Sequence, residues 1–216
     1  MPVEVKICGL KTAETLDAAV TGGAHFVGFV FFAPSPRHLG AAEAAALAAL
    51  VPAGISKVGL FVDAEEAAMD AVLAQVDLDM LQLHGTESPA RVTAVRARTG
   101  LPVIKAVPLS GPGDLDAAKA YAGAADRLLF DAKPPAGATT GRPGGNALSF
   151  DWRLLAGRDF ALPWILAGGL DAGNLARAVA LSGAVAIDVS SGVEDAPGVK
   201  NPAKISAFLA AAAELA

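Results

Sequence analysis

Two patterns of apolar and polar positions alternate along the chain. Eight short runs are rich in Val, Ile, Leu and Phe, as expected of strands that are buried on both faces. These runs cover residues 3–8, 26–32, 57–63, 80–84, 102–107, 127–131, 164–167 and 185–190. Ala-rich stretches of helical character follow them at residues 12–21, 41–50, 65–75, 88–99, 113–121, 151–156, 171–181 and 202–215. Strands that alternate with helices in this way predict parallel βαβ units.

Several predicted helices begin after a side chain that can accept a hydrogen bond from a free N–H of the first turn. The candidate caps are Thr12, Asp63, Thr86, Asp171 and Asn201.

Eight such units predict a closed barrel more readily than an open sheet. Dividing 216 residues by eight gives 27 residues for each unit, which is enough for a strand, a helix and two short loops. A doubly wound sheet is the alternative, but it calls for a G-x-G-x-x-G turn, and residues 8–12 read Cys-Gly-Leu-Lys-Thr. We therefore predict an α/β fold, a (β/α)₈ TIM barrel that forms one domain over residues 1–216. The Pro- and Gly-rich segment 132–149 is expected at the C-terminal face, where barrels build active sites.

Composition narrows the class of protein. Charged residues make up 18% of the chain and hydrophobic residues 53%, which argues against disorder. No run approaches the roughly 18 apolar residues of a membrane span, and the first residues do not resemble a secretory signal. The single Cys8 cannot form an internal disulfide, so we expect a cytoplasmic protein. The net charge of −5, without a cluster of Lys and Arg, argues against nucleic-acid binding.

Polar residues occupy one face of several predicted strands. If the apolar residues on the other face of each strand face the helices, these polar residues point into the barrel. They are Lys6, Cys8, Gln82, His84, Asp131, Asp188 and Ser190. Burying so many polar groups without partners costs several kcal/mol, so a ligand site at the barrel mouth is the economical explanation.

Each of these residues also has a purely structural interpretation. Cys8 is equally well explained as a small buried apolar side chain, and Asp131 as a helix cap. His84 could be a loop histidine with satisfied hydrogen bonds, and Lys6 and Asp188 could simply pair inside the barrel. The chain has neither the His and Cys spacing of a zinc site nor a G-x-S-x-G motif.

Glycines and serines end the last two predicted strands. Loops at these places in barrels often bind phosphate through backbone N–H groups, which a Cβ would obstruct. The candidate phosphate-binding residues are Gly168, Gly169, Ser190, Ser191 and Gly192, with Gly144 and Gly145 as further donors. The alternative is that these glycines only make tight turns.

Eight motifs, in this order, resemble the phosphoribosylanthranilate isomerases of tryptophan biosynthesis over essentially the whole chain. They are Lys6-Ile7-Cys8-Gly9, Ser35-Pro36-Arg37, Gly59-Leu60-Phe61-Val62, Leu81-Gln82-Leu83-His84-Gly85, Leu129-Phe130-Asp131, Phe150-Asp151-Trp152, Ala167-Gly168-Gly169-Leu170 and residues 188–194, Asp-Val-Ser-Ser-Gly-Val-Glu.

The resemblance implies a phosphate-binding (β/α)₈ barrel that catalyses an Amadori rearrangement of an aldosylamine to an aminoketose. The catalytic residues of the family fall on Cys8 and Asp131, and the residue that holds the anthranilate carboxylate falls on Arg37. Lys6, Gln82, His84 and Asp188 are expected to contact the substrate.

The residue types suit this chemistry. Asp131 is the expected acid for the ribose ring oxygen, with a pKa raised by the phosphate and Asp188. Cys8 is the expected base at C2, with a pKa lowered from about 8.5 toward neutrality by Lys6. The planar guanidinium group of Arg37 can donate to both oxygens of a carboxylate. The alternative is that Arg37 is a solvated arginine in a loop.

One departure from the family pattern lies in the loop before Phe150. The family commonly has Gly and then a basic residue there, whereas residues 146–149 read Asn-Ala-Leu-Ser.

Competing interpretations are a histidine-pathway ribotide isomerase, which pairs two aspartates and is disfavoured by Cys8, and a non-catalytic barrel that binds a phosphorylated metabolite. We expect a small-molecule substrate, no metal or organic cofactor, and a monomer or a homodimer.

Overall fold

The computed structural model describes residues 3–133, 144–145 and 148–215. Within these residues, eight parallel strands pair in chain order, and β8 returns to β1 to close a barrel. The strands are β1 Glu4–Cys8, β2 Phe26–Val30, β3 Ser56–Phe61, β4 Met80–Leu83, β5 Val103–Leu109, β6 Arg127–Ala132, β7 Trp164–Leu166 and β8 Ala186–Val189. The predicted (β/α)₈ barrel is confirmed, and an open doubly wound sheet is excluded.

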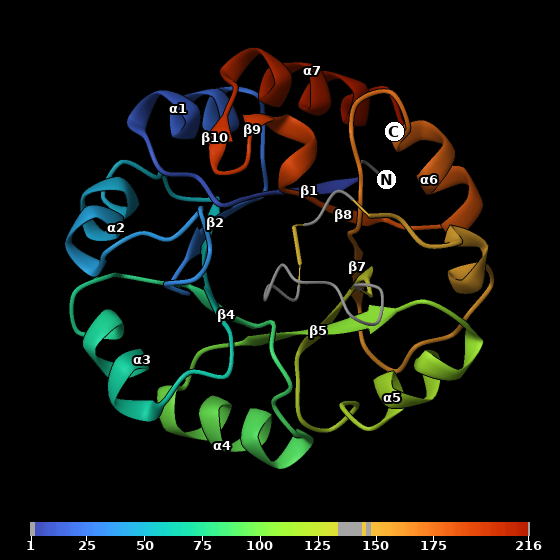
Figure 1. Cartoon of the computed structure of the whole chain (residues 1–216), viewed down its shortest axis with the longest axis horizontal. Coiled ribbons are helices and arrows are strands. Elements are labelled where there is room, and N and C mark those ends of the chain that lie inside the picture. Colours follow the sequence, from blue (N-terminus) through green and yellow to red (C-terminus); the bar gives the residue numbers. More distant parts are fainter. Residues whose placement is uncertain (1–2, 134–143, 146–147, 216) are drawn as a thin grey trace.

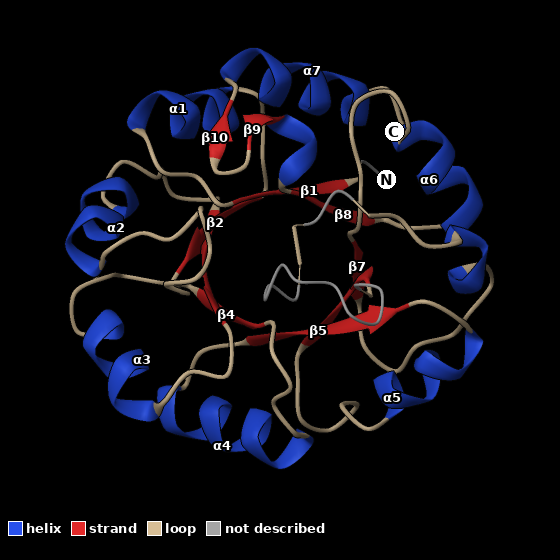
Figure 2. Cartoon of the chain, viewed as in Figure 1, coloured by secondary structure: helices blue, strands red, loops and turns tan. Residues whose placement is uncertain are grey.

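Helices form a ring outside the strands (Figures 1 and 2). They are α1 Ala13–Thr21, α2 Ala41–Ala48, α3 Glu66–Leu73, α4 Pro89–Thr99, α5 Leu115–Lys119, α6 Leu175–Ser182 and α7 Pro202–Ala213, with short 3₁₀ turns η1 Pro112–Asp114, η2 Trp152–Leu155 and η3 Ser191–Val193. No helix in the described part of the chain is both long enough and apolar enough to span a membrane.

The alternation of side chains along each strand produces two apolar layers. Leu128 and Phe130 of β6 belong to the layer between strands and helices, whereas Leu129 belongs to a separate cluster with Ile104 and Ile165. Because neighbouring residues of a strand point to opposite faces, this second cluster fills the barrel interior. The predicted assignment of faces is confirmed, and the polar residues near the strand ends lie above an apolar plug.

The predicted helix starts are correct only in part. Thr12 and Asn201 accept hydrogen bonds from first-turn N–H groups, as expected. The expectation for Thr86 is wrong, because Ser88 caps α4. Asp63 has a positive φ of 45° and accepts the N–H of Thr86 instead of capping α3.

Two further elements differ from the sequence-based expectation. The helix predicted at residues 151–156 is the single 3₁₀ turn η2. After β8 the chain forms an antiparallel hairpin of β9 Glu194–Ala196 and β10 Val199–Lys200, which the pattern did not predict. A two- or three-residue strand is too short to show an alternation of apolar and polar positions, yet this hairpin carries two side chains of the site described next.

Candidate active site

A pocket of about 770 Å³, the open space at its mouth included, lies at the C-terminal ends of the strands. The predicted site residues that line it are Cys8, Arg37, Gln82, His84, Asp131, Gly144, Gly145, Gly168, Gly169, Asp188, Ser190 and Ser191. Lys6 and Gly192 are not among the lining residues. The barrel therefore brings together most of the residues that the sequence placed at one site.

Lys6 and Asp188 form a buried ion pair in the pocket floor. They are register partners on β1 and β8, and Lys6 Nζ donates to Asp188 Oδ1 at 2.9 Å. Burial acts to lower the pKa of Lys6, but the charge of Asp188 and its hydrogen bond with Lys6 outweigh this effect, so the pKa is raised and Lys6 is a cation. Asp188 also lines the pocket, so the pair does more than fill the interior.

Cys8 ends β1 beside this pair and is 3% exposed. Burial raises the pKa of the Cys8 thiol; the charge of Lys6 lowers it and that of Asp188 raises it, and the net shift is upward. The expectation that Lys6 lowers this pKa toward neutrality is therefore wrong. The reason is that Asp188 compensates the charge of Lys6, while desolvation of the thiolate remains.

Gln82, His84 and Asp131 form a chain of hydrogen bonds across β4 and β6. The Gln82 Nε2 to His84 Nδ1 distance is 2.8 Å, and the His84 Nε2 to Asp131 Oδ2 distance is 3.2 Å. With Gln82 Nε2 as donor to Nδ1, the ring proton of His84 is on Nε2 and is donated to Asp131. A Cβ on Gly144 would lie 2.6 Å from Asp131 Oδ2, so only a glycine can approach the pair this closely.

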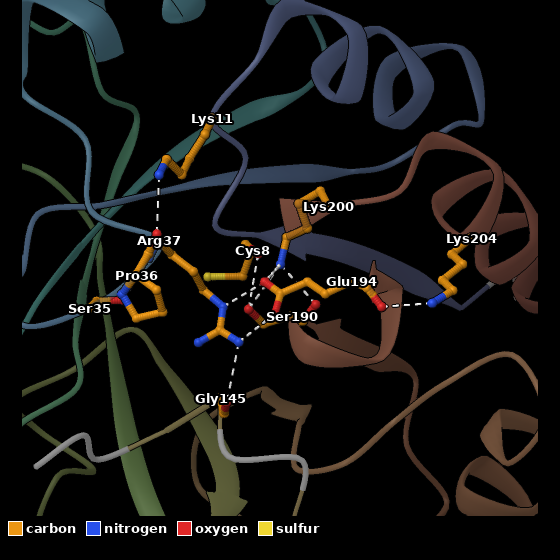
Figure 3. A network of polar contacts seen from close by, with 10 residues as sticks. All are labelled: Cys8, Lys11, Ser35, Pro36, Arg37, Gly145, Ser190, Glu194, Lys200 and Lys204. Atoms are coloured by element: carbon orange, nitrogen blue, oxygen red, sulfur yellow. Dashed lines mark hydrogen bonds and ion pairs between the residues drawn. The ribbon is translucent and has the colours of Figure 1, made fainter. Parts of the chain in front are cut away.

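Arg37 is 4% exposed, so the interpretation as a solvated loop arginine is wrong. Its Nε and Nη2 donate to the two carboxylate oxygens of Glu194 at 2.8 and 2.7 Å, and Nη2 also donates to Gly145 O (Figure 3). One edge of the guanidinium fork is therefore occupied. Nη1 makes no hydrogen bond with the described residues and remains for a ligand.

Glu194 and Lys200 are the residues that sequence reasoning missed. Lys200 Nζ donates to Glu194 Oε1 at 2.7 Å and to Ser190 O at 2.8 Å. Burial acts to raise the pKa of Glu194, but its hydrogen bonds and ion pairs with Arg37 and Lys200 hold it below the ordinary value. Glu194 is the last residue of the motif at residues 188–194, and this position was the only sign of its importance in the sequence. The hairpin that brings both residues to Arg37 is a tertiary feature.

The loops after β7 and β8 present free backbone donors. The N–H groups of Gly168, Gly169, Ser191 and Gly192 make no hydrogen bond to another described residue. Asn174 Nδ2 donates to Gly169 O at 2.8 Å and fixes the first loop. These loops therefore offer the geometry expected of an anion site.

Gly144 lies against the His84–Asp131 pair and Gly145 lies against Arg37. Of the departure at residues 146–149, Asn146 and Ala147 fall outside the described residues, whereas Leu148 lines the pocket.

Comparisons with known proteins agree with this geometry. The family model described as N-(5'phosphoribosyl)anthranilate (PRA) isomerase matches residues 5–211. N-(5'-phosphoribosyl)anthranilate isomerases of Rhodospirillum centenum and Paracoccus denitrificans are 59% and 60% identical to the chain, over 100% and 98% of both sequences.

Solved structures show the same likeness. The phosphoribosyl anthranilate isomerase of Thermotoga maritima superimposes with a TM-score of 0.86 at 34% identity, covering 97% of this chain and 98% of that one. A phosphoribosyl anthranilate isomerase in complex with reduced 1-(o-carboxyphenylamino)-1-deoxyribulose 5-phosphate gives a TM-score of 0.83 at 32% identity, with the same coverage. The chain therefore belongs to the N-(5'-phosphoribosyl)anthranilate isomerase family.

Proposed function

We propose that this chain converts N-(5'-phosphoribosyl)anthranilate to 1-(o-carboxyphenylamino)-1-deoxyribulose 5-phosphate, an aldose–ketose isomerisation of tryptophan biosynthesis. The observation that carries the proposal is that one thiol and one carboxyl group, Cys8 and Asp131, line a single pocket. They come from β1 and β6, which are separated by β7 and β8 on one side of the ring and by four strands on the other. An acid and a base can therefore approach a bound sugar from different walls.

The first step opens the ribose ring. Asp131 gives a proton to the ring oxygen, the bond between this oxygen and C1 breaks, and the lone pair of the anthranilate nitrogen forms a C=N bond. The Cys8 thiolate then removes the proton at C2, and the electron pair forms a C1=C2 bond while the C=N electrons return to nitrogen. Transfer of that proton to C1 and of the enol proton to Asp131 gives the aminoketose and restores both groups. No atom or electron is gained or lost.

Neighbouring side chains prepare the two catalytic groups. His84 donates to Asp131 Oδ2 and Gln82 fixes the ring of His84, so the carboxyl group is held in one orientation. The Lys6 ammonium lies beside Cys8 and stabilises the thiolate whenever it forms. Because the pKa of Cys8 is raised, the thiol predominates at neutral pH, and activity rises as the pH approaches that pKa.

The substrate is held at its two charged ends. Nη1 of Arg37 meets the anthranilate carboxylate as a charge-assisted donor. The phosphate takes hydrogen bonds from backbone N–H groups of Gly168, Gly169, Ser190, Ser191 and Gly192, with Gly144 and Gly145 as further donors. Asp188 and Gln82 face the ribose; Gln82 Oε1 is buried and has no partner among the described residues, so it is free to accept from a sugar hydroxyl.

The test is the turnover of phosphoribosylanthranilate, followed by fluorescence, in the wild type, Cys8→Ser and Asp131→Asn. Each variant is expected to lose about 10²- to 10⁴-fold in kcat, the contribution of a single general acid or base. Circular dichroism establishes that both variants are folded. Inactivity of the wild type, or full activity of both variants, contradicts the proposal.

We further propose that the protein acts in the cytoplasm, as a monomer or a homodimer. The Thermotoga maritima phosphoribosylanthranilate isomerase is dimeric, and a solved structure shows monomers generated from it. Light scattering of the purified chain decides between the two states.

A further inference from the structure

A buried cluster of two cations and one carboxylate lies at one side of the pocket. Arg37, Glu194 and Lys200 have side chains that are at most 5% exposed. Glu194 receives two hydrogen bonds from Arg37 and one from Lys200, so it bridges the two cations (Figure 3). The single carboxylate of Glu194 can balance only one of the two positive charges.

Lys200 is in its charged ammonium form, as its three hydrogen bonds require. Its Nζ contacts three oxygens: Glu194 Oε1, Ser190 O and Ser190 Oγ, at 2.7, 2.8 and 3.2 Å. The Ser190 hydroxyl has one proton, which it donates to Cys8 O, so Lys200 must be the donor to Ser190 Oγ. Three donated bonds require the ammonium form, since a neutral amine has only two N–H groups. Burial lowers the pKa of Lys200 and Arg37 acts in the same direction, as expected where two cations share one carboxylate.

The cluster therefore holds one positive charge that no described side chain compensates. Lys6 and Asp188, the other buried ions of the pocket floor, already neutralise each other. Burying a charge without a partner costs free energy, so binding of an anion next to the cluster is favourable. The donors that remain are on Nη1 of Arg37, which is a pocket residue, so this is where the anion is expected.

The backbone around Arg37 keeps that nitrogen in place. Gly9 has a φ of +82°, and a Cβ at this position would lie 2.8 Å from Arg37 Cδ. The aliphatic part of Arg37 therefore lies directly on the loop after β1, while Glu194 holds the Nε and Nη2 edge. Without Lys200, Arg37 and Glu194 would form a neutral pair with no preference for an anion.

We propose that Lys200 and Glu194 are positioning residues that orient Arg37, and that Lys200 supplies the excess positive charge that selects a substrate with a carboxylate. The inference rests on the proposed function and adds to it the residues that determine specificity. Neither residue needs to touch the reacting atoms. The predicted signature is a loss of discrimination between an anionic and a neutral ring substituent, not a general loss of binding.

The experiment compares two ligands by titration calorimetry: reduced 1-(o-carboxyphenylamino)-1-deoxyribulose 5-phosphate and the same molecule with a carboxamide in place of the carboxylate. The proteins are the wild type, Lys200→Met and Lys204→Met. Lys204 is the matched control, because its exposed ammonium also contacts the hairpin, at Glu194 O and Asp195. Lys200→Met is expected to reduce the preference for the carboxylate about tenfold, the effect of losing one nearby buried charge. Binding of the carboxamide and both affinities of Lys204→Met should stay within about twofold.

Two further variants test the same inference if Lys200→Met does not fold. Lys200→Gln keeps polar contacts and should lose the preference, whereas Lys200→Arg keeps the charge and should retain it. The inference is overturned if loss of the Lys200 charge weakens the binding of both ligands equally, because the charge would then act on the phosphate or on the fold. It is also overturned if the preference for the carboxylate is unchanged. Turnover by the wild type is a separate measurement: if phosphoribosylanthranilate is not converted, the proposed function fails, whatever the ligand preference.

Discussion

Lys105 of β5 and Glu87, two residues before α4, form a buried ion pair that offers a sharp test of stability. Their side chains are 2% and 4% exposed. Lys105 Nζ donates to Glu87 Oε2 at 2.7 Å, to Gly85 O at 2.8 Å and to Leu83 O at 3.2 Å. All three donated bonds end on the segment that carries His84, so the pair fixes this segment above the barrel.

Lys105→Met removes the three donors and keeps most of the apolar volume. Glu87 Oε1 still accepts the N–H of Asp63, but its charge is left buried without a cation. Removal of one partner of a buried pair costs about 3–5 kcal/mol. For a chain of this length, where 1 kcal/mol shifts the melting temperature by about 2–4 °C, this predicts a decrease of roughly 6–20 °C. The double variant Lys105→Met, Glu87→Gln should recover at least about 1 kcal/mol, since neither charge remains.

Equilibrium unfolding in urea, followed by far-ultraviolet circular dichroism, measures these differences. Lys119→Met is the matched control, because Lys119 pairs with Asp116 on the surface, where the side chains are 79% and 77% exposed. Its unfolding free energy should not change measurably, since exposed pairs contribute little. The reasoning is refuted if Lys105→Met loses no more stability than Lys119→Met, or if the double variant is less stable than Lys105→Met.

Three further predictions concern the pocket. Alkylation of Cys8 by iodoacetamide should have a pH midpoint above the value of about 8.5 for a free thiol, because burial raises its pKa; a midpoint at or below that value contradicts the assignment. Because folding favours the neutral thiol, its stabilising effect is present below the unfolded pKa and is lost as the pH rises through the folded pKa. Urea unfolding should therefore show a steeper loss of stability at alkaline pH in the wild type than in Cys8→Ser, and equal slopes count against it. Gly144→Ala would place a Cβ 2.6 Å from Asp131 Oδ2 and 2.7 Å from His84 Nε2; kcat should fall about tenfold or more with little change in melting temperature, and an unchanged kcat refutes the predicted displacement.

The barrel and most of its pocket were accessible from sequence patterns, because both depend on local periodicity. Alternation within a strand assigns each side chain to the helix side or to the interior, and this placed Cys8, His84 and Asp131 correctly at one pocket. The same reasoning could not weigh competing electrostatic effects. The sequence suggested that the charge of Lys6 lowers the pKa of Cys8. In the structure, the register of β1 and β8 pairs Lys6 with Asp188, and desolvation of Cys8 has the largest effect on its pKa.

The sequence by itself determined the order of strands and helices, the face on which each strand residue lies and the set of residues at the barrel mouth. The tertiary structure decided which of these residues interact. Glu194 lies 157 positions after Arg37 and reaches it only through the β9–β10 hairpin, and Glu87 meets Lys105 because β4 and β5 are neighbours in the barrel. The physical reason is that periodicity fixes directions along the chain, whereas charges and hydrogen bonds act across distances of a few ångströms that only the closed barrel establishes.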